Sequence, residues 1–198
     1  MSSISALLPD EAGAAGTHDR LLAAAAREFN TVGFYGTNTN KIARAAGFAP
    51  QTFYRHFEDK TDAFIAVYGA WQAQERGAVG KAVRSQGGAA AIARGVLQHH
   101  VDWRIFRRSL RLLAVEDARV RRARRGSREQ QVEALERLPA NTGRPRWSLY
   151  AALLTIERLC DAAADGELED LGVDGSEAIA AIAAAIADVR GEGGKGTR

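Results

Sequence analysis

The sequence predicts an all-α protein of about nine helices, in which an N-terminal three-helix helix-turn-helix domain precedes a larger C-terminal helical domain. Three observations lead to this fold class. Apolar residues recur at the helical spacing along most of the chain. No run of β-branched residues with a period of two is bounded by turn residues. Two short helical segments are joined by a tight turn containing Gly47, which is typical of a helix-turn-helix.

The composition is that of an ordinary globular chain. Of its 198 residues, 46% are apolar and 26% are charged, which argues against a chain that is disordered throughout. A single cysteine cannot form an internal disulfide, so a disulfide-framed secreted scaffold is excluded. Neither a signal peptide nor an apolar run of about 20 residues is present. We therefore expect a soluble, cytoplasmic protein that does not engage a membrane.

The first sixteen residues lack a helical period and are expected to form a disordered arm. The first helix is expected from Thr17, as its N-cap, to Gly33. Its apolar side is formed by Leu21, Leu22, Ala25, Phe29 and Val32, which follow the helical spacing. The second helix is expected over 39–46, the third from Pro50 to about His56, and the fourth from Asp59 to about Arg84.

Five further helices are expected beyond Gly87-Gly88, at about 89–104, 105–115, 118–137, 147–165 and 175–190. The turn-forming stretches at 139–145 and 166–175 separate the last three. The tail, 191–198, has no apolar residue to bury and is expected to be disordered. These boundaries place the helix-turn-helix domain at 17–68, with its motif at about 37–57, and a helical ligand-binding and dimerisation domain at 69–190.

The expected third helix carries aromatic side chains on one face and polar side chains on the opposite face. At 100° per residue, Phe53 and Phe57 share one face, while Arg55 and Gln51 lie opposite and Thr52 and Tyr54 flank them. The outward face combines a guanidinium, an amide, a hydroxyl and a phenol and has no carboxylate. Such a set can donate hydrogen bonds to base edges and phosphate oxygens in a major groove.

Three motifs carry a resemblance to a known family. They are Ala26-x-x-Phe29-x-x-x-Gly33-Phe34-Tyr35-x-Thr37, Ile42-Ala43-x-x-Ala46-Gly47, and Thr52-Phe53-Tyr54-Arg55-His56-Phe57-x-x-Lys60. The segment from Thr17 to Trp71 resembles the DNA-binding domain of the TetR family of transcriptional regulators. The resemblance implies a homodimer, a recognition helix in the major groove of a palindromic operator in double-stranded DNA, and a small-molecule effector bound by the C-terminal domain.

Carried over by position, the resemblance implies DNA contacts by eight residues: Thr37, Thr39, Gln51, Thr52, Tyr54, Arg55, His56 and Lys60. Thr37 and Thr39 match backbone contacts of the second helix, and Lys60 matches a phosphate contact near the start of the fourth. Two positions depart from the family pattern. Ala49 replaces the usual hydroxyl-bearing cap before the recognition helix, and Gln51 replaces a residue that is often glycine.

Several residues have plainer alternative interpretations. Tyr54 could be a packed surface aromatic, and a packing role for His56 is nearly as well supported as a DNA contact. The segment Arg104–Arg128 holds ten arginines against Glu116 and Asp117. We interpret it first as a solvated helix face, and otherwise as an anion-binding or DNA-steering patch.

Two further sites are predicted in the C-terminal domain. Its effector pocket is expected among aromatic residues, although each could be plain core: Trp71, Trp103, Phe106, Trp147 and Tyr150. Its dimer interface is expected along two apolar stripes at helical spacing, which could instead face the core of their own subunit: Leu149, Leu153, Ile156, Cys160, Ile179, Ile182, Ile186 and Val189.

We find no basis for an enzyme, a cofactor or a metal site. No glycine-rich phosphate loop or nucleophile elbow is present, and no Cys/His spacing fits zinc. His99 and His100 are adjacent, so they point about 100° apart on a helix. The sequence therefore favours a ligand-responsive, sequence-specific DNA-binding regulator, most simply a repressor. The alternative is a helical module that uses its helix-turn-helix to bind another protein.

Overall fold

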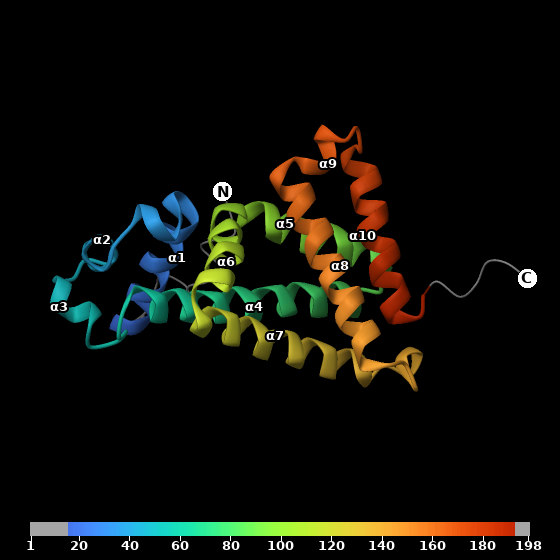
Figure 1. Cartoon of the computed structure of the whole chain (residues 1–198), viewed down its shortest axis with the longest axis horizontal. Helices are drawn as coiled ribbons and strands as arrows, with labels where there is room; N and C mark the ends of the chain where they lie inside the picture. Colours follow the sequence, from blue (N-terminus) through green and yellow to red (C-terminus); the bar gives the residue numbers. More distant parts are fainter. Residues whose placement is uncertain (1–15, 193–198) are drawn as a thin grey trace, which may run out of the picture. The chain divides into compact units, whose positions relative to one another are not determined.

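The computed structural model describes residues 16–192, all of its regular structure being helical (Figure 1). The elements in chain order are α1 (Thr17–Gly36), α2 (Thr39–Ala45), α3 (Pro50–Phe53), α4 (Lys60–Arg84), α5 (Gly88–Asp102), α6 (Arg104–Glu116), α7 (Ala118–Glu136), a 3-10 turn η2 (Pro139–Asn141), α8 (Arg146–Asp165), α9 (Glu167–Asp170) and α10 (Gly175–Arg190). Apart from Gly16, Gly191 and Glu192, the expected arm (1–16) and tail (191–198) lie outside the described residues.

The described residues confirm the all-α prediction, and the long helices begin and end within about two residues of the expected positions. The N-cap of α1 was predicted wrongly, although the helix begins at Thr17 as expected. Gly16 occupies the N-cap, no side chain caps this end, and Thr17 is already helical. At the other end, Gly33 has φ +73° and breaks the helix before Phe34–Gly36 add a last short turn. The four-residue α9 was missed because one turn of helix has no measurable period.

The chain divides into two compact units. Of the described residues, the first unit comprises 16–74 together with Trp103–Ala123, and the second comprises Glu75–Asp102 with 124–192. Helices α4 and α7 therefore each contribute residues to both units.

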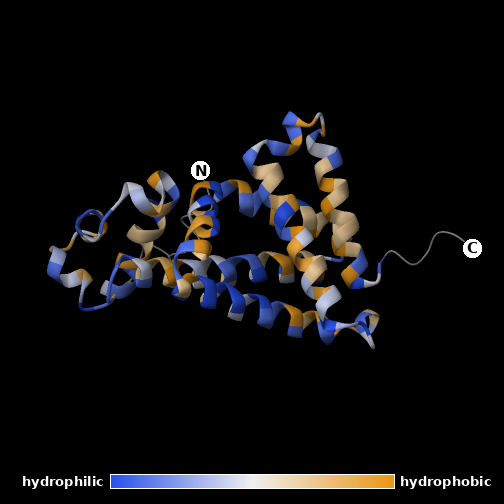
Figure 2. Ribbon diagram, viewed as in Figure 1, coloured by the Kyte–Doolittle hydropathy of each residue, from blue (hydrophilic) through white to orange (hydrophobic). Residues whose placement is uncertain are grey.

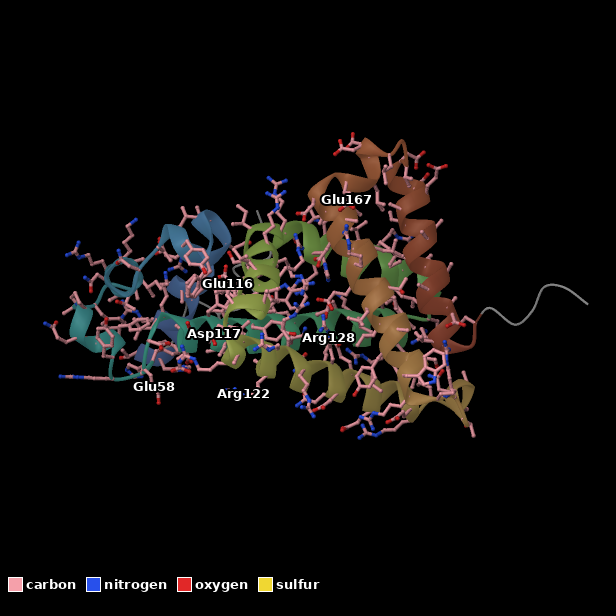
Figure 3. All side chains as sticks on the ribbon, viewed as in Figure 1. Glu58, Glu116, Asp117, Arg122, Arg128 and Glu167 are labelled. Atoms are coloured by element: carbon pink, nitrogen blue, oxygen red, sulfur yellow. The ribbon has the colours of Figure 1, made fainter. Side chains whose placement is uncertain are left out.

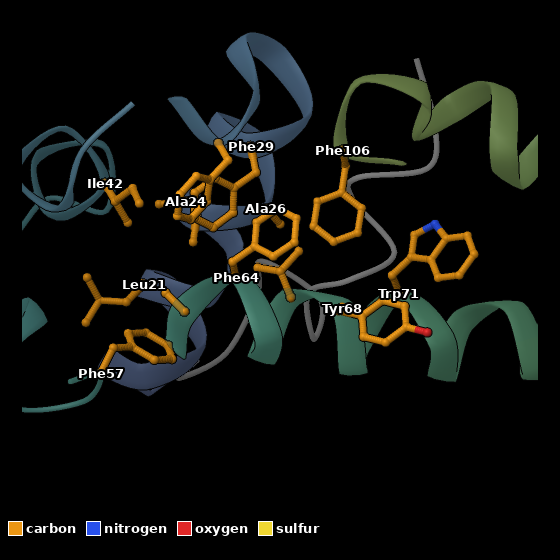
Figure 4. Close-up of a cluster of buried hydrophobic side chains, with 14 of the residues drawn as sticks. Leu21, Ala24, Ala26, Phe29, Ile42, Phe57, Phe64, Tyr68, Trp71 and Phe106 are labelled. Carbon is orange, nitrogen blue, oxygen red and sulfur yellow. The ribbon is translucent and has the colours of Figure 1, made fainter. Parts of the chain in front are cut away.

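An aromatic core holds the first unit together. Figure 4 shows Phe29, Phe64 and Phe106 grouped between α1, α4 and α6. The ring centroids of Phe64 and Phe106 are 4.6 Å apart, and those of Phe29 and Phe64 are 5.1 Å apart. Burial of each such ring stabilises the fold by about 1.5–3 kcal/mol. Helix α6 is fastened to α1 because the Phe34 N–H donates to the Ser109 hydroxyl at 3.0 Å.

The core of the second unit lies among α5, α8 and α10, which carry apolar residues on their facing sides (Figure 2). Its buried members are Ile92, Ala93, Val96, Cys160, Ile182 and Ile186. A buried polar group lies in the same unit: the His100 ring nitrogens lie 3.0 Å from an Asp161 oxygen and 3.3 Å from a Glu75 oxygen. His100 thus has carboxylate neighbours on both ring nitrogens.

The residues predicted for a dimer interface lie in this unit and largely in its core. Leu149, Cys160, Ile182, Ile186 and Val189 are buried in a single copy of the chain. Leu153, Ile156 and Ile179 are half-buried, and Ile156 and Ile179 pack against the same core. The stripes therefore face their own subunit, since helical spacing identifies an apolar face without showing what covers it. The buried members are not accessible to a second copy.

The arginine-rich segment is not a uniform solvated face. Arg107 is buried, with its guanidinium 4.8 Å from the centroid of Trp71. Arg124 and Arg128 both donate to the Glu157 carboxylate, Arg128 at 2.6 Å, and Figure 3 labels Arg128 on α7. Arg119 forms an ion pair with Asp59 at 2.9 Å. Ion pairing within each unit thus takes up part of the segment's charge.

Candidate nucleic-acid interface

Helices α2 and α3 form a helix-turn-helix whose turn depends on Gly47. Gly47 has φ +78°, a left-handed conformation that side-chain-bearing residues rarely adopt. The Phe48 N–H donates to the Ala43 carbonyl at 2.9 Å and the Gly47 N–H to the Arg44 carbonyl at 2.9 Å, which is the Schellman pattern of a helix end. Arg20 of α1 donates to the Ala46 carbonyl at 2.9 Å. The turn is therefore held both by its own backbone and by α1.

The predicted division of the recognition helix between buried and exposed faces is present. Phe53 and Phe57 are buried in the same core cluster as Leu21 of α1, and Figure 4 labels Phe57 and Leu21. The side chains of Gln51, Tyr54, Arg55 and His56 are exposed, and that of Thr52 is half-buried. Regular helix ends at Phe53, and a turn continues to His56. These residues thus present polar groups outward from an anchored aromatic pair.

A hydroxyl pair joins the two helices on their outer side. Thr39 Oγ1 and the Tyr54 hydroxyl are 3.0 Å apart, although Tyr54 is 58% exposed. Asn38 caps α2 by accepting the Lys41 N–H at 2.9 Å. This cap was not predicted, although an asparagine directly before a helical stretch is a sequence signal for one.

The structure places Thr37 and Lys60 differently from the other predicted contact residues. Thr37 is buried, and its hydroxyl donates to Glu28 at 2.6 Å. The Lys60 ammonium donates to the carbonyls of Phe34 at 2.7 Å and Thr37 at 3.0 Å. It also lies 4.1 Å from the centroid of the Phe34 ring. Thr37 therefore ties the turn between α1 and α2 to α1, and Lys60 binds backbone carbonyls at the same place; neither side chain extends from the surface.

Partial burial lowers the pKa of Lys60 below its ordinary value. The carbonyls it contacts compensate for this loss of hydration by accepting hydrogen bonds from the charged form. Because an ammonium has three donors, one N–H of Lys60 remains beyond these two bonds.

His56 lies beside the N-terminal helix. Its ring centroid is 6.0 Å from that of His18 on α1, and His18 lies 5.2 Å from Phe57. The side chain of His56 is nevertheless exposed. His56 thus packs beside another ring and is also accessible to a ligand, so both of its predicted roles are compatible with its position.

The electrostatic character of the motif is basic. Lys41, Arg44 and Arg55 are exposed, and no acidic residue occurs in 37–57. The first acids after the motif are Glu58, labelled in Figure 3, and Asp59. Asp59 caps α4 by accepting the Asp62 N–H at 2.8 Å. A basic surface without carboxylates is suited to a polyanion.

The five aromatic residues predicted to line an effector pocket are divided between the two units. Trp71, Trp103 and Phe106 lie in the core of the first unit, where the rings of Trp103 and Phe106 are 5.7 Å apart. Trp147 and Tyr150 belong to the second unit. Trp147 is 72% exposed, and Tyr150 has the Arg146 guanidinium 5.8 Å from its ring centroid.

Residues 16–192 contain neither a metal site nor a membrane-spanning helix. No group of three or more His, Cys, Asp or Glu side chains there is arranged to hold a metal ion. Among the same residues, no helix has the length and apolar character needed to cross a membrane.

Comparison with known proteins agrees with the geometry. The family model described as bacterial regulatory proteins, tetR family, matches residues 21–67, and no curated protein matches the chain. A TetR-family transcriptional regulator from Rhodococcus sp. superposes with a TM-score of 0.64 at 19% identity, covering 88% of this chain and 98% of that one. One from Streptomyces coelicolor gives 0.62 at 24% identity, covering 88% and 96%.

A transcriptional regulator from Rhodococcus sp. Rha1 gives a TM-score of 0.66 at 14% identity, covering 89% of this chain and 97% of that one. At these low sequence identities, the TM-scores establish likeness of fold alone. Residues 21–67 therefore carry the sequence signature of the tetR family of bacterial regulatory proteins, and the chain has the fold of solved TetR-family transcriptional regulators.

Proposed function

We propose that this protein is a sequence-specific DNA-binding transcriptional regulator that acts as a repressor and leaves its operator when a small molecule binds. The observation that carries the proposal is the recognition helix. Phe53 and Phe57 anchor it, while Gln51, Tyr54 and Arg55 are exposed on its outer side. Exposed donors on an anchored short helix are what major-groove readout requires.

The exposed residues divide into two roles. Arg55 and Gln51 have the reach and the donor pattern for base edges, since arginine pairs with guanine and glutamine with adenine. Thr39 and Tyr54 lie 3.0 Å apart and can together face the phosphate backbone. Thr52 and His56 complete the predicted contact surface. Thr37 and Lys60 support it from within, through Glu28 and the Phe34 carbonyl.

The proposed regulator acts as a homodimer, because two recognition helices on a two-fold axis match two half-sites of a palindromic operator. The exposed sides of α8 and α10 are the surfaces we assign to the partner copy. They follow helical spacing and are apolar or small at their centres: Trp147, Ala151, Leu154 and Thr155 on α8, and Ala180, Ala181 and Ala184 on α10. Alanines allow close helix approach, and exposed Trp147 and Leu154 supply apolar area to bury.

Effector control is proposed to operate through α4. This helix contributes Lys60–Gln74 to the first unit and Glu75–Arg84 to the second. Lys60 at its start holds the turn before α2, and Trp71 lies in the aromatic core. A ligand that displaces the packing around Trp71 and Trp103 would shift α4 and change the spacing of the recognition helices. Release requires that the ligand bind the non-operator spacing more tightly.

Selection from random-sequence duplex DNA tests the proposal. We expect enrichment of one palindromic sequence with half-sites about one helical turn apart, roughly 34–36 Å. Electrophoretic mobility shift with the enriched and a scrambled duplex then gives the specificity ratio. Failure to enrich any sequence would favour the alternative, a helix-turn-helix that binds another protein. Repression is tested separately by placing the enriched site between a promoter and a reporter gene.

A further inference from the structure

The second unit contains a half-open cavity of about 420 Å³. It lies at the end of the unit where α9 joins α8 to α10, close to Glu167, which Figure 3 labels. Its lining comes from α5, α8, α9, the following loop and the first turn of α10: Leu97, Val101, Ala163, Leu168, Glu169, Gly172, Val173, Asp174, Gly175 and Ala178. None of these residues belongs to the predicted DNA, effector or dimer sites.

The walls of the cavity are aliphatic. Leucine, valine, alanine and glycine provide the apolar lining, and no aromatic ring takes part. Val101 is 39% exposed, so apolar surface continues to the mouth. A volume of this size is within the range of small-molecule sites, and aliphatic walls are suited to an alkyl group.

The polar side chains of the lining are both carboxylates. Glu169 is exposed at the rim. Asp174 is fixed by the Ser176 hydroxyl at 2.6 Å and by the N–H groups of Ser176 and Glu177 at 2.7 and 2.9 Å. Hydrogen bonds from Ser176 and Glu177 lower the pKa of Asp174 below its ordinary value, so its negative charge is retained at neutral pH.

The sequence around Glu169 and Asp174 adds further negative charge. Between Leu159 and Val189 the chain has no lysine or arginine, whereas acidic residues recur throughout the interval. Arg158, which directly precedes this interval, donates to Glu167 at 2.6 Å. No basic side chain lines the cavity. The N-terminus of α10 offsets part of the Asp174 charge, but the remaining carboxylates leave the cavity more favourable to a cation than to an anion.

We propose that this cavity binds a small aliphatic cation, with an alkyl group against Leu97, Val101, Leu168 and Val173 and an ammonium group at the rim beside Glu169 and Asp174. The aliphatic walls and the carboxylates at the rim together favour an aliphatic cation. A neutral alkane would gain no charge attraction, and an anion would be repelled by the carboxylates. The proposal is independent of the DNA-binding function and of the effector mechanism described above.

The test uses the full chain and a homologous set of probes. Isothermal titration with hexyltrimethylammonium should give saturable one-to-one binding, and butyltrimethylammonium should bind more weakly, by up to about fourfold per methylene removed. Hexanesulfonate, with the same chain and the opposite charge, should not bind. Absence of saturable binding by the hexyl cation, or equal binding of the sulfonate, would overturn the proposal.

Three variants locate the binding. Glu169→Gln should weaken hexyltrimethylammonium about two- to fivefold, the usual scale for an exposed charge contact. Asp170→Asn removes a neighbouring exposed carboxylate that does not line the cavity, and should leave affinity unchanged. Ala163→Leu should reduce binding by filling the cavity, with circular dichroism confirming the fold. Equal losses in Glu169→Gln and Asp170→Asn would show a diffuse field instead of a site, and unchanged affinity in Ala163→Leu would place the probe elsewhere.

Discussion

The Lys60 ammonium donates to the Phe34 carbonyl at 2.7 Å, joining the first residue of α4 to the end of α1 across 26 positions of sequence. A second bond to the Thr37 carbonyl fixes the turn that leads into α2. Lys60, which was expected to contact phosphate, instead binds backbone carbonyls of its own chain. The entry of the chain into the helix-turn-helix depends on these two bonds.

Lys60→Met should therefore lower the stability of the protein without removing a phosphate contact. Loss of two charge-assisted hydrogen bonds should reduce the free energy of unfolding by about 1–3 kcal/mol, measured by chemical denaturation. Operator affinity should fall while the slope of log Kobs against log[salt] stays unchanged. Lys81→Met, at an exposed position in the last turn of α4, is the matched control and should change neither quantity. A slope reduced by about 0.9 in Lys60→Met, with stability intact, would instead show one lost phosphate contact.

Arg55→Ala and Gln51→Ala should relax sequence specificity. Each lost base contact should cost about 1–3 kcal/mol on the enriched operator and little on a scrambled duplex, because only base edges distinguish the two. Fluorescence anisotropy with both duplexes gives the ratio. Arg27→Ala removes an exposed arginine of α1 and serves as the control. If both recognition-helix variants keep the wild-type ratio, base reading by these residues is excluded.

Substitutions at α10 should separate the outer face from the core. Ala184→Arg, at an exposed position, should leave the subunit folded and convert the dimer to monomers with reduced operator affinity. Ile182→Glu should unfold the second unit, since loss of its buried apolar contacts alone costs about 2–5 kcal/mol and a carboxylate would be buried as well. Sedimentation velocity and circular dichroism distinguish the two results. A wild-type monomer at micromolar concentration would contradict the dimer itself.

Asp59 should make a stabilising contribution that depends on pH. Burial opposes ionisation, but the Asp62 N–H and Arg119 favour the carboxylate more strongly and lower the pKa of Asp59 below its ordinary value. The contribution is therefore present above the unfolded-state pKa and is lost as pH falls through the lower native value. Asp59→Ala should cost about 0.5–2 kcal/mol at pH 7, with the difference from wild type shrinking below about pH 4. An equal difference at pH 3 and pH 7 would refute the charge assignment, and Glu58→Gln provides the control.

An effector should couple stability to release. A compound found to raise the melting temperature should also weaken operator binding, by roughly 5–150-fold for a coupling of about 1–3 kcal/mol. Trp71→Phe should reduce the stabilisation if the ligand contacts the core around that residue. Stabilising compounds that all leave operator affinity unchanged would rule out transmission through α4, without affecting the DNA-binding proposal.

Much of the local structure follows from the sequence alone. Helical spacing and glycine positions are enough to locate the long helices, because apolar periodicity and helix-terminating residues both act over a few neighbouring positions. The same local geometry separates Phe53 and Phe57 from Arg55 on the recognition helix. The polar outward set of the proposed DNA-binding surface was thus predictable from a single helix.

Tertiary structure decides which partner each side chain meets. Ile182 belongs to an apolar stripe in the sequence, but only packing against α5 shows that the stripe faces its own subunit. Trp147 is equally apolar and is exposed. Lys60 has a flexible stem that could reach solvent, DNA or backbone, and it reaches the Phe34 carbonyl because the folding of α1 and α4 brings that acceptor within range. Periodicity specifies the direction in which a side chain leaves its helix, whereas its contacts depend on segments far away in the chain.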